Sequence, residues 1–444
     1  MMSSTARHYM RALRVGAVAL LALVLLAGCI GQDSGKDQGF TELDLAQIPS
    51  VTPVPTDVPA TAVATGQGGV TGVIPPTSAR TLASSQLVSL QPDELGVIPV
   101  FMYHALTDAD STDDLWTRTI KDFRSDLQWL YDHDFYVVSM REMLSDEITA
   151  PPGKHPVVLT FDDSSAGQFQ FEKNKAGDLV PTADSTVGVL EAFYAQHPDF
   201  GHSGLFALLP FNCFSSDDEY NTMDYCDQKL NWLSDHGYEI GNHTWGHQDL
   251  SAVGADEIAS QIGKTMDFID QRVKGPGNMS RVLVLPYGAM PDPNVDWWAW
   301  STVYQGFTWN GEAVTLDAVV NVNGGVVPSP ASTAWNPLSI NRFNTEPDLI
   351  AYWFNEFENG DLTLYTSDGN PQTVVVPNDL PDQLAADFDP DALAAAGKTA
   401  LTYDPKSGEV ALAHGEPEGA ASAQVTDITA RHRNRVSGFD VSLH

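Results

Sequence analysis

The sequence predicts an α/β fold in which parallel strands and outer helices form a (β/α) barrel, either closed or incomplete. Short apolar segments with strand composition alternate with helical stretches over residues 97–360. Such alternation is typical of a parallel sheet with helices outside it. Many strand–helix units follow one another in this one region, which favours a barrel over the alternative, an open doubly wound sheet.

The expected strands are short apolar runs. They occupy residues 97–103, 135–139, 156–161, 205–209, 238–240 and 282–285. Apolar residues at helical spacing predict helices at residues 122–134, 184–196, 223–236, 255–273 and 347–358. In the first of these helices, Phe123, Leu127 and Leu130 fall on one face.

The N-terminus has the pattern of an export signal. Three arginines precede an unbroken run of apolar and small residues, 15–27, whose length suits a secretory signal better than a membrane span. The run ends in Leu26-Ala27-Gly28-Cys29, which resembles a bacterial lipoprotein signal. We expect residues 1–29 to be the signal and lipidation region, with Cys29 as the lipidated residue. An uncleaved membrane anchor is the alternative, and it also places the protein outside the cytoplasm.

Two flanking regions lack the pattern of the central domain at residues 97–360. Residues 30–96 are rich in Thr, Pro, Val, Ala and Gly without sustained periodicity, which predicts a disordered tether. Residues 361–444 are rich in Asp, Ala, Gly and Pro but contain strand-like pieces at 398–403 and 409–412. For this C-terminal extension we expect a small appended unit or a loosely ordered segment.

The charge of the chain restricts its partners. Its 58 acidic and 23 basic residues give a formal charge of −35. A surface this acidic argues against nucleic acid as a partner and would repel acidic polymers. A neutral or cationic polymer suits it better, although solubility alone is a sufficient reason for such a charge.

The chain contains three cysteines. If Cys29 carries a lipid, Cys213 and Cys226 remain, and an oxidising compartment allows them to pair. We expect a disulfide between them that closes one loop. Two buried free thiols are the alternative.

An aspartate pair follows one of the expected strands. Asp162 and Asp163 end the run Thr160-Phe161-Asp162-Asp163, at the carboxyl end of a strand, where a barrel has its active site. Neighbouring residues of an extended segment point in different directions. One carboxylate can therefore bind a metal while the other faces a substrate, although such a pair in a loop is more often a turn or a helix cap.

Two histidines follow another expected strand. His243 and His247 lie four residues apart, and this spacing puts them on one face of a helical turn, where they can share a metal. Two imidazoles and one carboxylate suit a catalytic zinc with an open position for water. The same spacing also arises by chance among surface histidines.

A third motif, Leu285-Pro286-Tyr287-Gly288, ends the strand expected at 282–285. A turn of this kind can direct a backbone N–H into a site, although it is also an ordinary way to end a strand. The three motifs lie in order at the ends of three expected parallel strands. Together they offer an Asp-His-His metal set with a second Asp beside it.

The ordered set Thr-Phe-Asp-Asp, His-Thr-x-x-His and Pro-Tyr-Gly resembles the polysaccharide deacetylase family, also described as nodulation-type deacetylases or carbohydrate esterases. The resemblance extends over residues 98–357 and includes the segments at 100–104, 329–332 and 340–342. It implies a distorted (β/α) barrel that hydrolyses N-acetyl groups of cell-surface amino-sugar polymers.

The same resemblance implies the roles of single residues. Asp162 would be the base, and the metal ligands would be Asp163, His243 and His247. The family's last motif, Leu-x-His, supplies a general acid. Its close match here is Leu412-Ala413-His414, in the C-terminal extension. His104, which follows the first strand, is the rival candidate.

Two positions depart from the family's pattern. A glycine usually follows the Asp-Asp pair, and here Ser164 follows it. The third motif normally has an arginine two residues before its proline, where it holds the base, and here that position is Val284. Arg342 is a candidate replacement, but the sequence does not place it near Asp162.

These residues suit the hydrolysis of an amide. A divalent metal, which we expect to be zinc, binds the carbonyl oxygen and lowers the pKa of a water, whose proton Asp162 takes. The backbone N–H of Tyr287 would stabilise the oxyanion, and such a donor is worth roughly 3 kcal/mol. We therefore expect a metal-dependent hydrolase that removes N-acetyl groups from an extracellular, N-acetylglucosamine-containing polysaccharide.

Two alternatives stay open, a non-catalytic glycan-binding lipoprotein and an O-acetyl esterase that uses the same site. The expected partners are the amino-sugar polysaccharide and a membrane, contacted through the lipid anchor. We expect the protein on the outer side of the cytoplasmic membrane or at the cell surface. Neither nucleic acid nor a nucleotide cofactor is expected.

Overall fold

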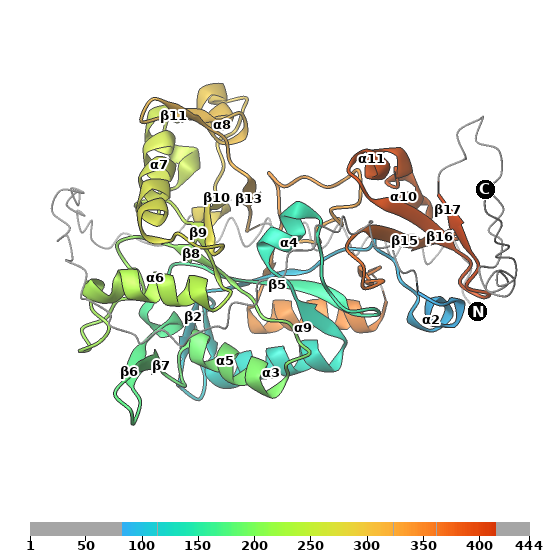
Figure 1. The fold of residues 1–444 in the computed structure, drawn as a ribbon. Coiled ribbons are helices and arrows are strands. Elements are labelled where there is room, and N and C mark those ends of the chain that lie inside the picture. The colour runs from blue at the N-terminus through green and yellow to red at the C-terminus, as the bar shows by residue number, and fades with distance from the viewer. Residues whose placement is uncertain (1–81, 113, 323, 361, 414–444) are drawn as a thin grey trace, which may run out of the picture.

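A computed structural model describes residues 82–112, 114–322, 324–360 and 362–413 (Figure 1). The signal region with Cys29, the tether up to residue 81 and His414 lie outside the described residues. Within the described ranges, none of the helices combines the length and the apolar character that a membrane crossing requires.

The centre of the molecule is an eight-stranded sheet. Its strands are β1 (Val100–Tyr103), β4 (Phe135–Val137), β5 (His155–Phe161), β8 (Leu205–Leu208), β9 (Glu239–Asn242), β10 (Asn278–Val284), β13 (Ala318–Val320) and β14 (Phe343–Asn344). They lie in the order β13-β10-β9-β8-β5-β1-β14, with β4 beside β5. All of these pairings are parallel, so the carboxyl ends of the strands share one face of the molecule.

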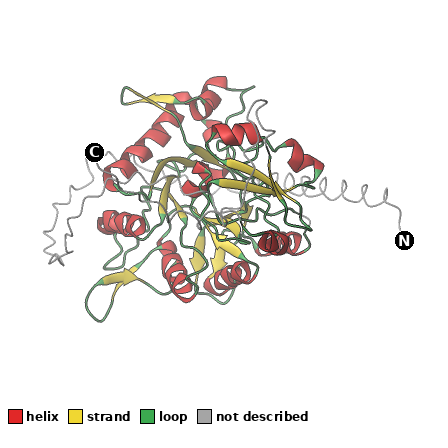
Figure 2. Ribbon diagram, turned by 45° about the vertical axis from the view of Figure 1, so that its right-hand side comes forward, coloured by secondary structure: helices red, strands yellow, loops and turns green. Residues whose placement is uncertain are grey.

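Helices surround this sheet (Figure 2). They are α3 (Ile120–Asp132), α4 (Met140–Ser145), α5 (Thr186–Gln196), α6 (Cys226–Asp235), α7 (Ala255–Arg272), α8 (Trp297–Tyr304) and α9 (Pro347–Glu358). In α3 the expected apolar face is buried, and Phe123, Leu127 and Leu130 belong to the same core as Phe101 and Phe161 of the sheet. Burial of such a face, rather than helix propensity alone, holds the helix in place.

A short segment links the two ends of the curled sheet. Ile340 pairs in parallel with Val320 of β13, and Phe343 pairs with Phe101 of β1. The N–H of Ile340 donates to Val319, and its carbonyl accepts from Asn321. The strands thus form a curled, incomplete barrel with helices outside, which confirms the expected fold class.

Small two-stranded sheets and short turns lie outside the main sheet. They are β2 (Ala105–Thr107) with β3 (Thr117–Thr119), β6 (Phe171–Lys173) with β7 (Leu179–Pro181), β11 (Phe307–Trp309) with β12 (Glu312–Val314), and the 3-10 turns η2 (Ala166–Gln168), η3 (Met223–Tyr225), η4 (Leu250–Ala252) and η5 (Pro286–Gly288). Of these sheets, β2–β3 is parallel and the others are antiparallel hairpins.

Several expected boundaries differ from the observed ones by a few residues, and two of these differences change the type of structure. The strand expected to reach residue 139 ends at Val137, because Ser139 caps α4: its side chain accepts the N–H of Glu142, whose carboxylate accepts the N–H of Ser139. The helix expected from residue 223 begins as a 3-10 turn and becomes α-helical at Cys226.

The C-terminal extension contains a small folded unit. It comprises β15 (Thr373–Pro377), α10 (Asp382–Ala386), α11 (Pro390–Ala395), β16 (Thr399–Tyr403) and β17 (Val410–Leu412), with the three strands in one sheet. Of the two expectations for residues 361–444, the small appended unit therefore holds for residues 362–413.

The expected tether is too long at its C-terminal end, because residues 82–96 are folded onto this unit. Helix α2 (Ser84–Leu90) lies beside β16 in Figure 1, and Leu87 is buried against Val375, Leu401 and Tyr403. Glu94 is also buried, and its carboxylate accepts the N–H of Val375. An apolar anchor and a buried hydrogen bond thus order a stretch whose composition predicted disorder.

Candidate active site

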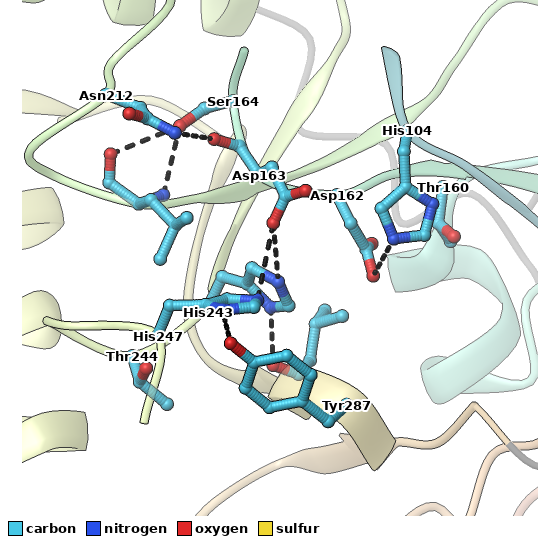
Figure 3. Close-up of polar contacts among 12 residues, drawn as sticks. His104, Thr160, Asp162, Asp163, Ser164, Asn212, His243, Thr244, His247 and Tyr287 are labelled. Carbon is cyan, nitrogen blue, oxygen red and sulfur yellow. Dashed lines mark hydrogen bonds and ion pairs between the residues drawn. The ribbon is translucent and has the colours of Figure 1, made fainter. Parts of the chain in front are cut away.

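The three sequence motifs meet at the carboxyl ends of β5, β9 and β10, with β8 between β5 and β9 in the sheet. Asp162 and Asp163 follow β5, His243 and His247 follow β9, and Tyr287 follows β10. Figure 3 shows their side chains pointing toward one another from these separate strands. The structure therefore brings together the residues that the sequence placed on three strand ends.

Asp163, His243 and His247 form a compact set of metal-binding atoms. The Oδ1 atom of Asp163 lies 3.3 Å from Nε2 of His243 and 3.4 Å from Nε2 of His247. One ligand atom from each residue lies within 4.8 Å of the others. A carboxylate and two imidazoles at this separation can surround one divalent ion.

The other ring nitrogen of each histidine is engaged elsewhere. Nδ1 of His243 donates to the carbonyl of Val284 at 2.8 Å, and Nδ1 of His247 lies 2.9 Å from the hydroxyl of Tyr287. Such contacts fix ring orientation and leave Nε2 to face the ion. The surroundings of both histidines thus fit a metal site.

The charge states of Asp163 and His247 suit a cation. Burial lowers the pKa of His247 to about 4, with the charge of His243 adding to the effect, so His247 is neutral at neutral pH. Burial alone would raise the pKa of Asp163, but the hydrogen bond and charge of His243 outweigh it and lower that pKa. An ionised carboxylate and a neutral imidazole are the forms that bind metals, so Asp163 and His247 already have the binding form. Burial would lower the pKa of His243, but the hydrogen bond to Asp163 and the charges of Asp162 and Asp163 outweigh it and raise that pKa, so a metal must displace any proton that His243 carries.

Asp162 is held by Arg342. Nη1 and Nη2 of Arg342 donate to the two carboxylate oxygens of Asp162 at 2.6 and 2.8 Å, and both residues are almost fully buried. Burial alone would raise the pKa of Asp162, but the charge of Arg342, the charge of His243 and these hydrogen bonds hold it well below its ordinary value. Asp162 therefore stays ionised and fixed in orientation.

The position of Arg342 comes from the segment that links the barrel ends. Arg342 lies between Ile340 and Phe343, and its Nε donates to the carbonyl of Asn321 at 2.8 Å. It thus replaces, from another strand end, the arginine that the third motif lacks at Val284. The carbonyl of Val284 instead orients His243.

The structure places one of the two general-acid candidates, His104, beside Asp162. Nε2 of His104 lies 3.9 Å from Oδ2 of Asp162, and burial lowers the pKa of His104. The ring of Trp116, a residue that the sequence did not single out, lies 4.9 Å from the His104 ring. His414 is outside the described residues, so of the two candidates only His104 can be placed relative to the site.

Several motif residues adopt a left-handed backbone. Asp163, Ser164, Thr244, His247 and Tyr287 have φ values between 43° and 75°. This region is uncommon for residues other than glycine and is often found at functional sites. Ser164 stands where the family has glycine, and its hydroxyl accepts the N–H of Leu209 and donates to the carbonyl of Leu209, which anchors the turn.

A loop beside the aspartates was not identified from the sequence as part of the site. Asn212 donates from Nδ2 to the carbonyl of Asp163 at 3.0 Å. The adjacent Cys213 forms a disulfide with Cys226, with their Cα atoms 5.6 Å apart. The one signal for this loop in the sequence was the cysteine pair itself.

The sequence model of the polysaccharide deacetylase family matches residues 209–297. The matched part includes His243, His247 and Tyr287, so the match confirms the resemblance for the second and third motifs, and Asp162 and Asp163 lie outside it. A comparison with curated proteins gives no match.

Solved structures of deacetylases are similar to the chain. The Streptococcus pyogenes deacetylase PplD, in complex with acetate, is 19% identical over 57% of this chain and 94% of its own, with a TM-score of 0.40. A polysaccharide deacetylase from Bacillus cereus is 13% identical over 59% of this chain and 69% of its own, with a TM-score of 0.41. IcaB from Ammonifex degensii is 16% identical over 59% of this chain and 96% of its own, with a TM-score of 0.39.

Proposed function

We propose that this chain, a deacetylase that carries a polysaccharide deacetylase domain, is an exported metal-dependent hydrolase. Its reaction removes N-acetyl groups from an N-acetylglucosamine-containing polysaccharide. The observation that carries the proposal is the Asp162–Arg342 pair beside the set of Asp163, His243 and His247. One carboxylate is fixed and ionised next to a second that faces two imidazoles, so the two can perform different tasks.

The residues divide the reaction among them. Zinc suits the donor set, and when bound it supplies a Lewis acid that polarises a carbonyl and acidifies water. Asp162, held ionised by Arg342, accepts the proton of the attacking water. The backbone N–H of Tyr287, in its left-handed turn, donates to the oxyanion. Burial lowers the pKa of His104, so this ring donates a proton to the leaving amine only after it has accepted one, and Asp162, which takes the proton of the water, lies 3.9 Å away.

Arg342 weakens the case for a non-catalytic glycan-binding protein. That alternative rested on a missing arginine and an uncertain general acid. Arg342 provides the first, and His104 stands at a suitable position for the second. The O-acetyl esterase alternative uses the same residues, and an ester leaving group needs less help from an acid.

Export and lipid attachment at Cys29 belong to this proposal. The disulfide between Cys213 and Cys226 supports it, because such bonds persist in oxidising compartments outside the cytoplasm. Mass spectrometry of the membrane-associated protein should find a lipid on Cys29. A chain that retains its N-terminal arginines and carries no lipid would contradict the anchor but not the enzymatic activity.

Acetate release from N-acetylglucosamine oligomers tests the activity. The parent protein with zinc should release acetate, and a chelator should abolish the release until metal is restored. Asp162→Asn should lower kcat by at least about 100-fold, the lower range for loss of a general base. Absence of release with metal supplied would contradict the proposal, and faster release from O-acetylated oligomers would favour the esterase.

A further inference from the structure

Two loops with unusual backbone conformations face each other beside the metal set. Residues 162–164 follow β5, and residues 209–214 follow the neighbouring strand β8. We call residues 209–214 the clamp loop. Asp163 and Ser164 have φ values of 75° and 43°, and Cys213 and Phe214 in the clamp loop have 37° and 57°. Non-glycine residues keep such conformations only where their surroundings impose them.

Hydrogen bonds join the clamp loop to the backbone of Asp163 and Ser164 (Figure 3). Asn212 donates from Nδ2 to the carbonyl of Asp163 at 3.0 Å. The N–H of Phe214 donates to the carbonyl of Ser164 at 2.7 Å. The hydroxyl of Ser164 bonds both the N–H and the carbonyl of Leu209, at 3.0 and 3.1 Å. Both peptide groups that follow Asp163 and Ser164 are therefore held from the clamp loop.

The clamp loop is itself fastened to the core. Cys213 is linked to Cys226, the first residue of α6, and both cysteines are buried. One turn further along α6, the buried Lys229 donates from Nζ to the carbonyl of Phe214 at 2.6 Å. Gln170 donates to the same carbonyl at 3.0 Å. A covalent bond and two hydrogen bonds thus fix a loop that lies directly beside the site.

We infer that the disulfide-fastened clamp loop positions the metal ligand Asp163, with Asn212 as the positioning residue. The direction of the Asp163 carboxylate follows from its left-handed backbone, because φ and ψ set where the side chain leaves the chain. Asn212 holds the carbonyl that ends this turn. Partners that hydrogen-bond a ligating side chain directly typically change metal affinity by about 10- to 100-fold, and Asn212, which acts through the backbone of Asp163, should lie at the lower end of this range.

Zinc affinity, measured by competition with a chromogenic chelator, tests this inference, which rests on the proposed metal-dependent function. Asn212→Ala should weaken zinc binding by about tenfold while circular dichroism and thermal unfolding of the metal-free protein stay close to the parent. Asn355→Ala is the matched control, since Asn355 also donates to a backbone carbonyl, at 2.8 Å, but on the exposed face of α9. It should leave zinc affinity unchanged.

The double substitution Cys213→Ala with Cys226→Ala tests the fastening separately. It should weaken zinc binding by a similar factor in protein that is still folded. Unchanged affinity in folded Asn212→Ala overturns the inference, as does loss of folding in both variants, because the loop would then serve the fold rather than Asp163. A parent protein that binds no divalent metal overturns the proposed function and the inference with it, whereas tight binding in both parent and variants overturns the inference alone.

Discussion

Asp162 and Asp163 are neighbours in the chain with opposite surroundings. Asp162 is buried, and both of its oxygens accept hydrogen bonds from Arg342. The side chain of Asp163 is one-third exposed and faces His243 and His247. The sequence predicted that the pair would divide into two roles because adjacent side chains point apart. It named Arg342 as a candidate to hold Asp162 but could not place the two together, because Arg342 lies on another strand end.

Removal of the Arg342 guanidinium should lower both the free energy of unfolding and the activity. Arg342→Met would leave Asp162 buried without its partner, which typically costs about 3–5 kcal/mol of unfolding free energy. Activity should fall by at least about 100-fold, because the base is no longer held. Arg342→Lys keeps the charge but loses the two-pronged contact, so it should lie between the parent and Arg342→Met.

Urea denaturation and acetate release measure these effects. Arg281→Met is the control, since Arg281 is exposed on β10 and donates to the carbonyl of Thr315. Its effect on stability should stay within about 0.5 kcal/mol. Equal stability and activity in Arg342→Met and the control would show that Asp162 does not depend on Arg342.

The low pKa of Asp162 predicts how stability depends on pH. The folded protein holds this pKa below the ordinary value of 3.8, so the folded state binds the proton less readily than the unfolded state. The stabilising contribution is therefore fully present above about pH 5 and is lost as the pH falls below 4. The free energy of unfolding of the parent should fall toward that of Asp162→Asn over this range.

Denaturation of both proteins between pH 7 and about pH 3 tests this prediction. Other carboxylates titrate in both proteins, so their contributions cancel in the difference. A difference in unfolding free energy between parent and variant that stays constant, or widens as the pH falls, would contradict a lowered pKa for Asp162.

At the scale of elements, the local sequence pattern predicted most helices and strands of the barrel, because their formation depends mainly on residues close together in the chain. The helix expected at 347–358 has the bounds of α9, and the strand expected at 156–161 is β5 less its first residue, His155. Contacts between distant segments were not predictable in this way. The segment around Arg342 links β13 to β1, and α2 is ordered by strands nearly 300 residues later in the chain. Composition predicted a disordered tether through residue 96, which was wrong for residues 82–96, because composition could not show the distant partners of Leu87.

Helix α2 should therefore contribute to the stability of the C-terminal unit. Leu87 is 1% exposed and packs on Val375, Leu401 and Tyr403, so Leu87→Ala should cost about 3 kcal/mol. Val88, the next residue, is 36% exposed, and Val88→Ala should change stability by no more than about 0.5 kcal/mol. Urea denaturation compares the two, and similar losses in both would show that α2 is not anchored through Leu87.

At the scale of the whole molecule, the acidic charge acts on a polymer whose own charge changes during the proposed reaction. The chain carries 58 acidic and 23 basic residues. Each N-acetyl group removed leaves an amine that becomes positive when protonated. The substrate is thus neutral, while the product is attracted to the protein. If the acidic charge served solubility alone, the binding of the product and the binding of the substrate would respond to salt in the same way.

Inhibition by the product should therefore weaken as salt is added. Between about 0.01 M and 1 M ionic strength the screening length falls from about 30 Å to about 3 Å, so attraction between exposed charges is largely removed. A fully deacetylated oligomer should inhibit acetate release at low salt, with an inhibition constant that rises at least about tenfold over this range. The KM for a neutral, fully acetylated oligomer of the same length is the control and should change far less, because no long-range charge attraction contributes to its binding. Inhibition that is independent of salt would mean that the product binds through contacts within the site, and that the acidic surface plays no part in choosing between the two polymers.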